Sequence, residues 1–408
     1  MSSHFIALSG TGTQPDVLHR RREAEEAKDE PLPKKLDAAF QTDEARPFIA
    51  PQSHAAAVRS CRCSDRGAGS EDDFYRPRPA HPGAWEGDDF VGKRELLLGL
   101  QQGARERLLE LVRRHRALVA EPWQLPRMQW QDERLQAALA PAVLQLRRGR
   151  GFALIGGLPV GELELPKLKL AYWILGAQFG AAQPQGTRGE RIDEIGDTSA
   201  GGSDPARSRR ATVLHTDACD MVALLAVRGA RSGGVTSLAS ALTVHERLRA
   251  ERPDLLARLY EGYRYHRRGE EAPGEEPITA HRVPVFSVTA GHLNLRYVRS
   301  YMETALKSLG ERDPLLIEAF DRVERIARET AFSFTLAPGE LLLLNNLTTL
   351  HARSACTDWD EPQRRRLLLR LSLNEPGFRP QAPELNLYGS GHGAPQRSGR
   401  NASFASLV

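Results

Sequence analysis

The sequence has few cysteines and no strong excess of charge of either sign. Only four of its 408 residues are cysteine, which excludes the dense disulfide framework of small secreted domains and is typical of a reducing compartment. Cys61 and Cys63 have no second pair with which to complete a zinc knuckle. The net charge of +4 comes from 56 basic and 52 acidic residues, so a nucleic-acid partner is not expected.

Long apolar runs are also missing. No stretch approaches the roughly 18 residues that a membrane-spanning helix needs, and residues 1–15 lack a cationic segment followed by an apolar one. We therefore expect a cytoplasmic protein that acts on a small molecule, without a membrane partner. A homo-oligomer is compatible with the sequence.

The composition changes along the chain. Residues 1–90 are rich in Pro, Ala, Gly, Ser and charge, and show no sustained periodicity, so we predict a poorly ordered tail. We expect a helical extension at 91–148, a catalytic domain at 149–378 and a C-terminal tail at 379–408.

Apolar periodicity predicts the main elements. Helices are expected at 93–121 with an interruption near Gly103, at 134–147 with Pro141 bending or dividing it, and at 165–179, 244–261 and 313–330. Short strands are expected at 151–159, 221–227, 235–239, 284–288, 293–298, 331–336, 341–344 and 367–373. Several short strands with Gly and Pro turns favour a β-sandwich or barrel.

The pattern that carries chemistry is His215-Thr216-Asp217 with a distant His351. Two imidazoles and one carboxylate form the 2-His-1-carboxylate triad that holds Fe(II) and leaves coordination positions open. Residues i and i+2 of an extended segment point the same way, so His215 and Asp217 could hold one ion together. The alternatives are a half-buried strand histidine and a turn or capping aspartate.

Three further segments accompany the triad. Gly-Gly-Val-Thr at 233–236 offers a flexible turn and the Thr236 hydroxyl, or else an ordinary hairpin turn. A buried strand at 341–346 leads to His351. Arg366 and Arg370 lie in an otherwise apolar strand, where an unpaired charge is costly. They need anionic partners, either a dicarboxylate ligand or structural salt bridges.

The order of these segments resembles the taurine dioxygenase (TauD/TfdA) family of Fe(II)/2-oxoglutarate-dependent dioxygenases, over about residues 149–377. His-Thr-Asp at 215–217, Gly-Gly-Val-Thr at 233–236, His-Ala-Arg at 351–353 and Arg-Arg-Leu-Leu-Leu-Arg at 365–370 carry the resemblance. It implies an α+β fold with a double-stranded β-helix core, a jelly roll of the clavaminate synthase type, flanked by helices.

The resemblance also implies residue roles. His215, Asp217 and His351 would bind Fe(II), and Thr236 and Arg366 would hold the distal carboxylate of 2-oxoglutarate, with O2 as the second co-substrate. Arg370 lies where the family places a second anion-binding arginine. Arg296 and Tyr297 are similar to a segment near the substrate in some members, although a solvated Arg and a packed Tyr are the alternative.

The expected reaction is hydroxylation of an unactivated C–H bond in a small anionic or zwitterionic metabolite, amino-acid-like or a sulfonate, with conversion of 2-oxoglutarate to succinate. Desaturation and epoxidation are alternatives.

The loop at 266–281 is a candidate lid or a plain surface excursion. The competing functions are a non-catalytic jelly-roll sensor that binds a metal or a small acid, and a basic nucleic-acid-binding protein. Asn345-Asn346-Leu347 departs from the Asp-Asn-Arg common in the family.

Overall fold

The computed structural model describes residues 81–185, 190–196, 210–271 and 274–388. Most of the expected N-terminal tail, and the end of the C-terminal one, lie outside the described residues. A seven-stranded sheet has the order β1-β2-β12-β6-β15-β3, with β4 beside β15. The strands are β1 (Leu97–Gly99), β2 (Phe152–Gly156), β12 (Leu341–Asn345), β6 (Met221–Arg228), β15 (Leu367–Asn374), β3 (Ala181–Ala182) and β4 (Asp193–Gly196).

A second sheet of four strands has the order β11-β8-β13-β5. These are β11 (Phe332–Phe334), β8 (Thr236–Ser240), β13 (Thr349–Arg353) and β5 (Thr212–His215). The two sheets form the double-stranded β-helix that the resemblance implied. One core lies between them, where Phe152, Leu344 and Leu368 of the large sheet meet Leu238 and Phe334 of the small one. Two further pairs of antiparallel strands lie outside these sheets. β9 (Phe286–Thr289) and β10 (His292–Leu295) form a hairpin, whereas β7 (Ser232–Gly233) pairs with the distant β14 (Cys356–Thr357).

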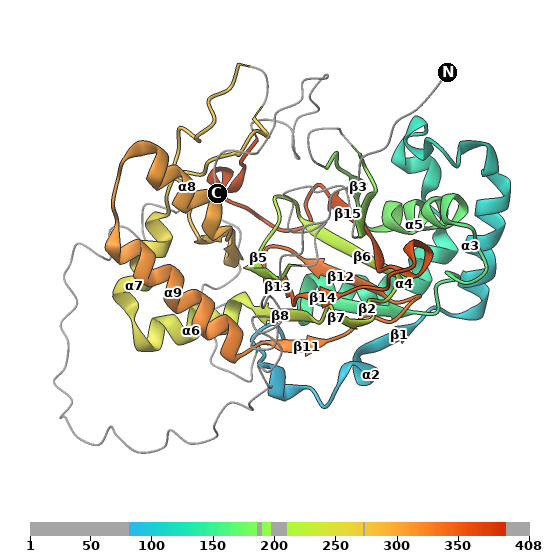
Figure 1. The fold of residues 1–408 in the computed structure, drawn as a ribbon, viewed down its shortest axis with the longest axis horizontal. Helices are drawn as coiled ribbons and strands as arrows, with labels where there is room; N and C mark the ends of the chain where they lie inside the picture. The colour runs from blue at the N-terminus through green and yellow to red at the C-terminus, as the bar shows by residue number, and fades with distance from the viewer. Residues whose placement is uncertain (1–80, 186–189, 197–209, 272–273, 389–408) are drawn as a thin grey trace, which may run out of the picture. The chain divides into compact units, whose positions relative to one another are not determined.

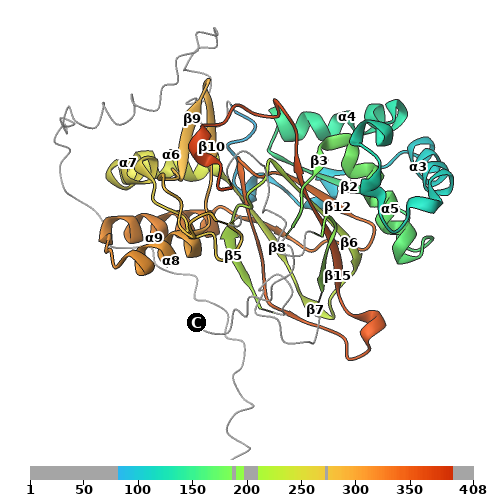
Figure 2. The same ribbon diagram turned by 90° about the horizontal axis from the view of Figure 1, so that it is seen from above.

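Helices cover the outer faces of both sheets. Figure 1 shows α3 (Gln102–Arg114), α4 (Glu133–Arg148) and α5 (Leu165–Phe179) beside the large sheet, where their apolar side chains share a core with β2, β6, β12 and β15. The view from above shows the second group, α6 (Ala241–Glu251), α7 (Pro253–Glu261), α8 (Arg299–Leu309) and α9 (Pro314–Glu329), on the other side (Figure 2). These helices pack on β9, β10 and the small sheet.

Aspartate side chains cap the N-termini of α4 and α9. Asp132 accepts a hydrogen bond from the Leu135 amide at 3.1 Å and Asp313 one from the Leu316 amide at 2.8 Å, which satisfies amides that a helix start leaves without partners. In α9 the buried residues Leu316, Phe320 and Val323 recur at helical spacing and form the stripe that faces the core.

The structure corrects several expected boundaries. The helix expected at 93–121 is divided by β1, because Leu97–Gly99 pairs in parallel with β2, leaving a short α2 (Lys93–Leu96) before it. The helix at 244–261 breaks at Arg252, before Pro253 opens α7. In contrast, α4 continues through Pro141. β5 and α8 were not expected, and His351 lies inside β13 rather than after a strand.

Candidate metal centre and co-substrate site

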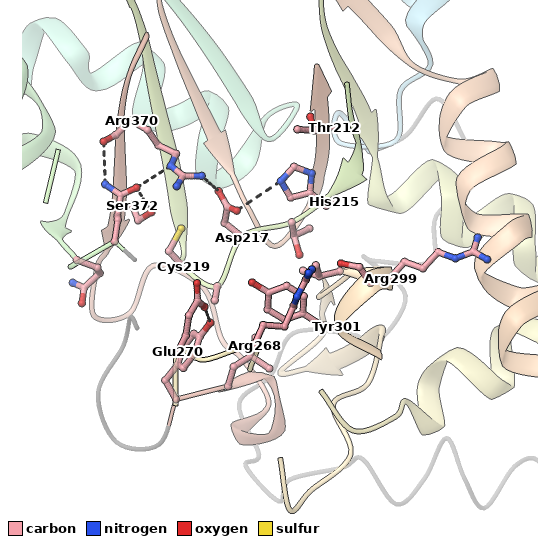
Figure 3. Close-up of a pocket in the computed structure, with 18 of the residues that line it drawn as sticks. Thr212, His215, Asp217, Cys219, Arg268, Glu270, Arg299, Tyr301, Arg370 and Ser372 are labelled. Carbon is pink, nitrogen blue, oxygen red and sulfur yellow. Dashed lines mark hydrogen bonds and ion pairs between the residues drawn. The ribbon is translucent and has the colours of Figure 1, made fainter. Parts of the chain in front are cut away.

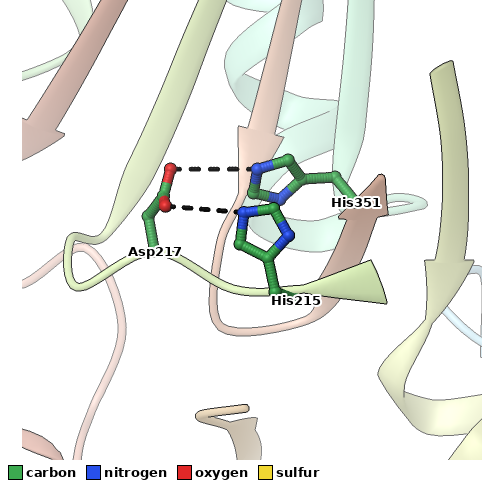
Figure 4. A group of neighbouring side chains, drawn as sticks. All are labelled: His215, Asp217 and His351. Atoms are coloured by element: carbon green, nitrogen blue, oxygen red, sulfur yellow. Dashed lines mark ion pairs between the residues drawn. The ribbon is translucent and has the colours of Figure 1, made fainter. Parts of the chain in front are cut away.

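Two neighbouring strands of the small sheet bring the candidate metal ligands together. His215 is the last residue of β5, and His351 lies directly opposite it on β13. The centroids of the two imidazole rings are 4.3 Å apart. Asp217 follows β5, and its carboxylate faces both histidines (Figure 4). One ligand atom from each residue lies within 4.8 Å of the other two, so the expected triad assembles in the folded chain.

Both imidazoles present the Nε2 atom to the Asp217 carboxylate. The distances are 3.7 Å from His215 Nε2 to Oδ1 and 3.8 Å from His351 Nε2 to Oδ2. The Nδ1 atom of His215 lies 2.8 Å from the carbonyl oxygen of Val213. Because a carbonyl only accepts, Nδ1 carries the proton there and Nε2 keeps its lone pair. That lone pair points at the place a metal ion would take.

The electrostatic setting keeps these groups in their metal-binding protonation states. Burial and the neighbouring His215 lower the pKa of His351 to about 3, so its imidazole is neutral at physiological pH. Burial pushes the pKa of Asp217 upward, but the Arg370 guanidinium and the two imidazoles outweigh it and lower the pKa to about 2. Metal binding requires deprotonated ligands, and all of these shifts favour them.

The backbone around Asp217 is held by residues from distant segments. Asn346 accepts a hydrogen bond from the Asp217 amide at 2.9 Å, and its Nδ2 donates to the carbonyl oxygens of Asp217 and Cys219. Arg296 also donates to the Asp217 carbonyl. The Tyr297 amide donates to the Thr216 hydroxyl at 2.9 Å. These bonds fix the direction in which the Asp217 carboxylate points.

Arg370 of β15 places its guanidinium beside the triad. Arg370 donates to Asp193 and Gln185, at 3.0 and 2.9 Å, and its Nη1 lies 3.7 Å from Asp217 Oδ2. Structural partners therefore hold this guanidinium on the wall of the cavity next to the metal ligands. The alternative of a structural salt bridge and the anion-binding role expected from the sequence are both compatible with this position.

Arg366 lies in a different, basic corner beside β8. Its side chain is buried, and none of the carboxylates in the described part of the chain forms an ion pair with its guanidinium. Burial and the neighbouring Arg353 lower the pKa of Arg366 to about 10. The Gly-Gly-Val-Thr segment borders the same corner. A Cβ atom at Gly234 would lie 3.7 Å from Arg366 Nε, and Thr236 is the cross-strand partner of Arg353. A buried guanidinium that lies beside a second arginine, and that no carboxylate of the described chain pairs with, suits an anionic ligand.

A cavity of about 510 Å³ opens onto the triad. His215, Asp217, Cys219 and Arg370 form one wall, and the side chains opposite come from the loop after α7 and from α8 (Figure 3). Those opposite residues include Arg268, Glu270, Arg299 and Tyr301, and Tyr388 of the C-terminal segment also lines the cavity. The loop at 266–281 therefore contributes to the cavity; whether it moves as a lid stays a prediction.

The two residues predicted to contact the substrate are buried beside the segment that carries Asp217. Arg296 is 3% exposed and Tyr297 fully buried, and neither lines this cavity. Arg296 instead supports the Asp217 backbone, and the Tyr297 hydroxyl faces Glu324 on α9 at 3.3 Å. The sequence marked Asn346 only as a departure from the family pattern, and it did not single out Glu270 or Tyr388. For Asn346 a signal existed, since two adjacent amides interrupt an apolar strand, but Glu270 and Tyr388 lie in segments without a motif.

The donor set fits the group that such a site would hold. Two neutral imidazoles and one ionised carboxylate are the ligands typical of mononuclear non-haem Fe(II). The Asp217 Oδ2 atom is buried and has no hydrogen-bond donor among the described residues, as expected for an oxygen that binds a metal ion. The buried Arg366 guanidinium is a cation of the kind that a carboxylate of an anionic ligand pairs with.

Comparison with known proteins agrees with this geometry. The model of the family described as "Taurine catabolism dioxygenase TauD, TfdA family" matches residues 113–372. FR-33289 synthase of Streptomyces rubellomurinus is 32% identical over 286 residues, which cover 67% of this chain and 84% of that protein. A taurine hydroxylase-like protein of Stachybotrys chartarum is 30% identical over 165 residues, 39% of this chain and 41% of the other.

Solved structures share the fold at low sequence identity. An asparagine oxygenase in complex with Fe(II), 3-hydroxyasparagine and succinate has a TM-score of 0.52 at 17% identity, covering 68% of this chain and 93% of that one. The non-haem iron oxygenase OrfP, in complex with iron, succinate and a hydroxylated arginine, has a TM-score of 0.51 at 17% identity, covering 72% and 99%. At this identity the likeness concerns the fold alone.

Proposed function

The chain belongs to the TauD/TfdA dioxygenase family, and from this premise we propose that His215, Asp217 and His351 bind the Fe(II) ion of a 2-oxoglutarate-dependent dioxygenase. The observation that carries the proposal is the convergence of one ligand atom from each of the three residues within 4.8 Å, at the wall of a cavity. The two histidines lie opposite each other on adjacent strands.

When bound, iron with 2-oxoglutarate and O2 would supply the oxidising chemistry. One oxygen atom of O2 would convert 2-oxoglutarate to succinate and CO2, and the other would be inserted into a C–H bond of the substrate. The protein positions the reactants and excludes water. Its carboxylate ligand is intact, which favours hydroxylation over halogenation. Desaturation and epoxidation are the other outcomes open to the same site.

We assign the far carboxylate of 2-oxoglutarate to the corner formed by Arg366, Thr236 and Arg353. The Arg366 guanidinium is buried and lacks an ion pair within the described chain, so binding an anion there compensates a charge that folding has already desolvated. The Thr236 hydroxyl makes no hydrogen bond to another described residue and can donate to the same carboxylate.

The substrate is a small molecule that fits the cavity. Its volume of about 510 Å³ lies within the range of small-molecule sites. Basic and acidic side chains both line it, which favours an anionic or zwitterionic metabolite. The structures similar to this chain include enzymes in complex with hydroxylated asparagine and arginine, which makes an amino-acid-like or sulfonate substrate the first to test.

We also propose that residues 149–378 form the catalytic domain and that 91–148 pack on it. The contact is apolar: Leu108 and Leu135 of the preceding helices share a core with Ile174 of α5 and Leu343 of β12. No helix in the described ranges is long and apolar enough to cross a membrane.

Succinate formation tests the function. Purified protein given Fe(II), 2-oxoglutarate and O2 is expected to release succinate, fastest with its true substrate, and Asp217→Ala is expected to release none above background. A sensor with the same site would bind iron and 2-oxoglutarate but give no succinate with any compound screened. That result would favour the non-catalytic alternative.

A further inference from the structure

The loop that follows α7 places a carboxylate in the cavity opposite the metal ligands. Main-chain hydrogen bonds fix its base: the His266 amide donates to the Tyr301 carbonyl at 3.1 Å, and the Thr279 amide to the Tyr265 carbonyl at 2.9 Å. Within the loop, the Glu270 amide donates to the Arg267 carbonyl at 3.0 Å. Glu270 and Arg268 consequently line the same cavity as Asp217 (Figure 3).

Only one oxygen of the Glu270 carboxylate is occupied. The Tyr388 hydroxyl donates to Oε2, whereas no donor among the described residues reaches Oε1. Tyr301 and Tyr388, both lining the cavity, stand close to this carboxylate. Burial raises the pKa of Glu270, which shows that the carboxylate is partly desolvated without full compensation.

The cations of the cavity do not neutralise Glu270. Arg299 is bound by Glu303, Asp321 and Glu324, and Arg370 by Asp193. Arg268 is exposed, and its guanidinium lies 5.8 Å from the centroid of the Tyr301 ring. None of the basic side chains in the described ranges forms an ion pair with Glu270. The cavity thus presents a carboxylate oxygen near Tyr301 and Tyr388, and such a setting attracts a cation.

We infer that Glu270 is a specificity-determining residue, which binds a protonated amine of the substrate through its unoccupied oxygen while Tyr388 holds the other. This inference rests on the proposed function and deepens it, because it assigns a cationic nitrogen to the substrate. The amine end of the substrate faces the loop, and the carbon to be oxidised faces His215 and Asp217 across the cavity.

The test uses the holoenzyme and matched pairs of compounds. The proteinogenic amino acids and taurine, each beside its N-acetylated counterpart, are screened for stimulated succinate release. We expect every active compound to carry a protonated amine, and acetylation of that amine to abolish the stimulation. Glu270→Gln should raise the KM for the active compound by about 10- to 100-fold, the loss expected for one charge-assisted hydrogen bond, and leave the KM for the co-substrate unchanged.

Two further variants separate recognition from a structural role. Gln at position 270 can still accept the Tyr388 hydrogen bond, so the loop contact survives while the charge is lost. Tyr388→Phe keeps the charge and should raise the KM less than Glu270→Gln does. Glu276→Gln, an exposed carboxylate of the same loop that does not line the cavity, should match the wild type.

Several results would overturn the inference. One is turnover of an acetylated compound as fast as its parent, and another is a KM in Glu270→Gln within twofold of the wild type. The third is that none of the amine compounds stimulates succinate release, although the enzyme forms the complex with iron and 2-oxoglutarate. Failure to form that complex in the wild type is a different result. It would overturn the proposed function itself and this inference with it.

Discussion

His215 and His351 are cross-strand partners on β5 and β13, although they lie far apart in the sequence. This register gives their rings a centroid separation of 4.3 Å and turns both Nε2 atoms toward Asp217. A slip of β5 by one residue would move its side chains to the opposite face of the sheet. The geometry of the proposed metal centre is therefore a consequence of strand pairing.

Asn346→Ala should weaken iron binding. The Asn346 amide accepts from the Asp217 backbone and donates to the carbonyls of Asp217 and Cys219, so its removal frees the segment that carries the carboxylate ligand. We expect the iron affinity to fall by about 10- to 100-fold, as for other residues that orient metal ligands. Asn345→Ala is the matched control, since this buried amide donates to the Leu146 carbonyl instead. Anaerobic iron titration measures the iron affinity of both variants. Equal losses of affinity would contradict the role of Asn346 in orienting Asp217.

Arg366→Ala should impair 2-oxoglutarate binding and spare iron binding. The variant removes the buried guanidinium expected to meet the far carboxylate, so the KM for the co-substrate should rise by about 100-fold, from the loss of about 3 kcal/mol in a charged hydrogen-bonded pair. Arg364→Ala, which removes an exposed arginine stacked on Trp359, should leave this KM unchanged. An unchanged KM in Arg366→Ala would place the co-substrate elsewhere.

Gly233→Ala should destabilise the turn beside the basic corner. Gly233 has φ of +72°, and a Cβ atom there would lie 2.3 Å from the carbonyl oxygen of Ala355. We expect the free energy of unfolding to fall by about 1–3 kcal/mol and the KM for the co-substrate to rise. Gly229→Ala is the control, because a Cβ atom at Gly229 meets nothing within 4 Å. Urea unfolding measures the free energy of unfolding of both variants. Equal values for Gly233→Ala and Gly229→Ala would contradict this prediction.

Buried His245 should make the metal-free protein less stable in acid. Burial lowers the pKa of His245 to about 4, below the value near 6.5 of an unfolded chain. Between these two pKa values the unfolded state binds the extra proton, so the stability conferred by neutral His245 is lost as pH falls from about 6.5. Between pH 7.5 and 5 this residue should contribute about 2 kcal/mol to the loss.

The variant His245→Gln checks this assignment. Its free energy of unfolding, measured in urea at both pH values with a chelator present, should change less with pH than that of the wild type. His351, whose pKa is also lowered, acts in the same direction and remains in the variant, so part of the pH dependence should persist. An identical pH dependence in the two proteins would show that His245 is not responsible.

The sequence predicted the central strands because their pattern is strong. β2 and β12 are buried on both faces, and such strands appear as continuous apolar runs. β5 gives no such signal: it is short, and its Val213 is 64% exposed. β13 was not predicted as a separate strand, because only a short turn at 346–348 separates it from β12.

The candidate site was predictable to the extent that it depends on motifs. The His-x-Asp pair, His351 and Arg366 stand in a recognisable order, and the fold brings the three metal ligands together. Glu270 and Tyr388 could not be found in this way, because a loop and a C-terminal segment place them and neither has periodicity. The substrate contacts expected at Arg296 and Tyr297 relied on similarity alone and stay a prediction, since neither residue is among those that line the cavity.

The most direct test is an anaerobic titration of the metal-free protein with Fe(II) and 2-oxoglutarate, followed by the weak visible charge-transfer band of the complex. The wild type is predicted to develop the band with both additions present, Asp217→Ala to lose it, and Arg366→Ala to need far more 2-oxoglutarate. A folded wild-type protein that shows no band with iron and co-substrate supplied would contradict the assignment of His215, Asp217 and His351 as an iron centre.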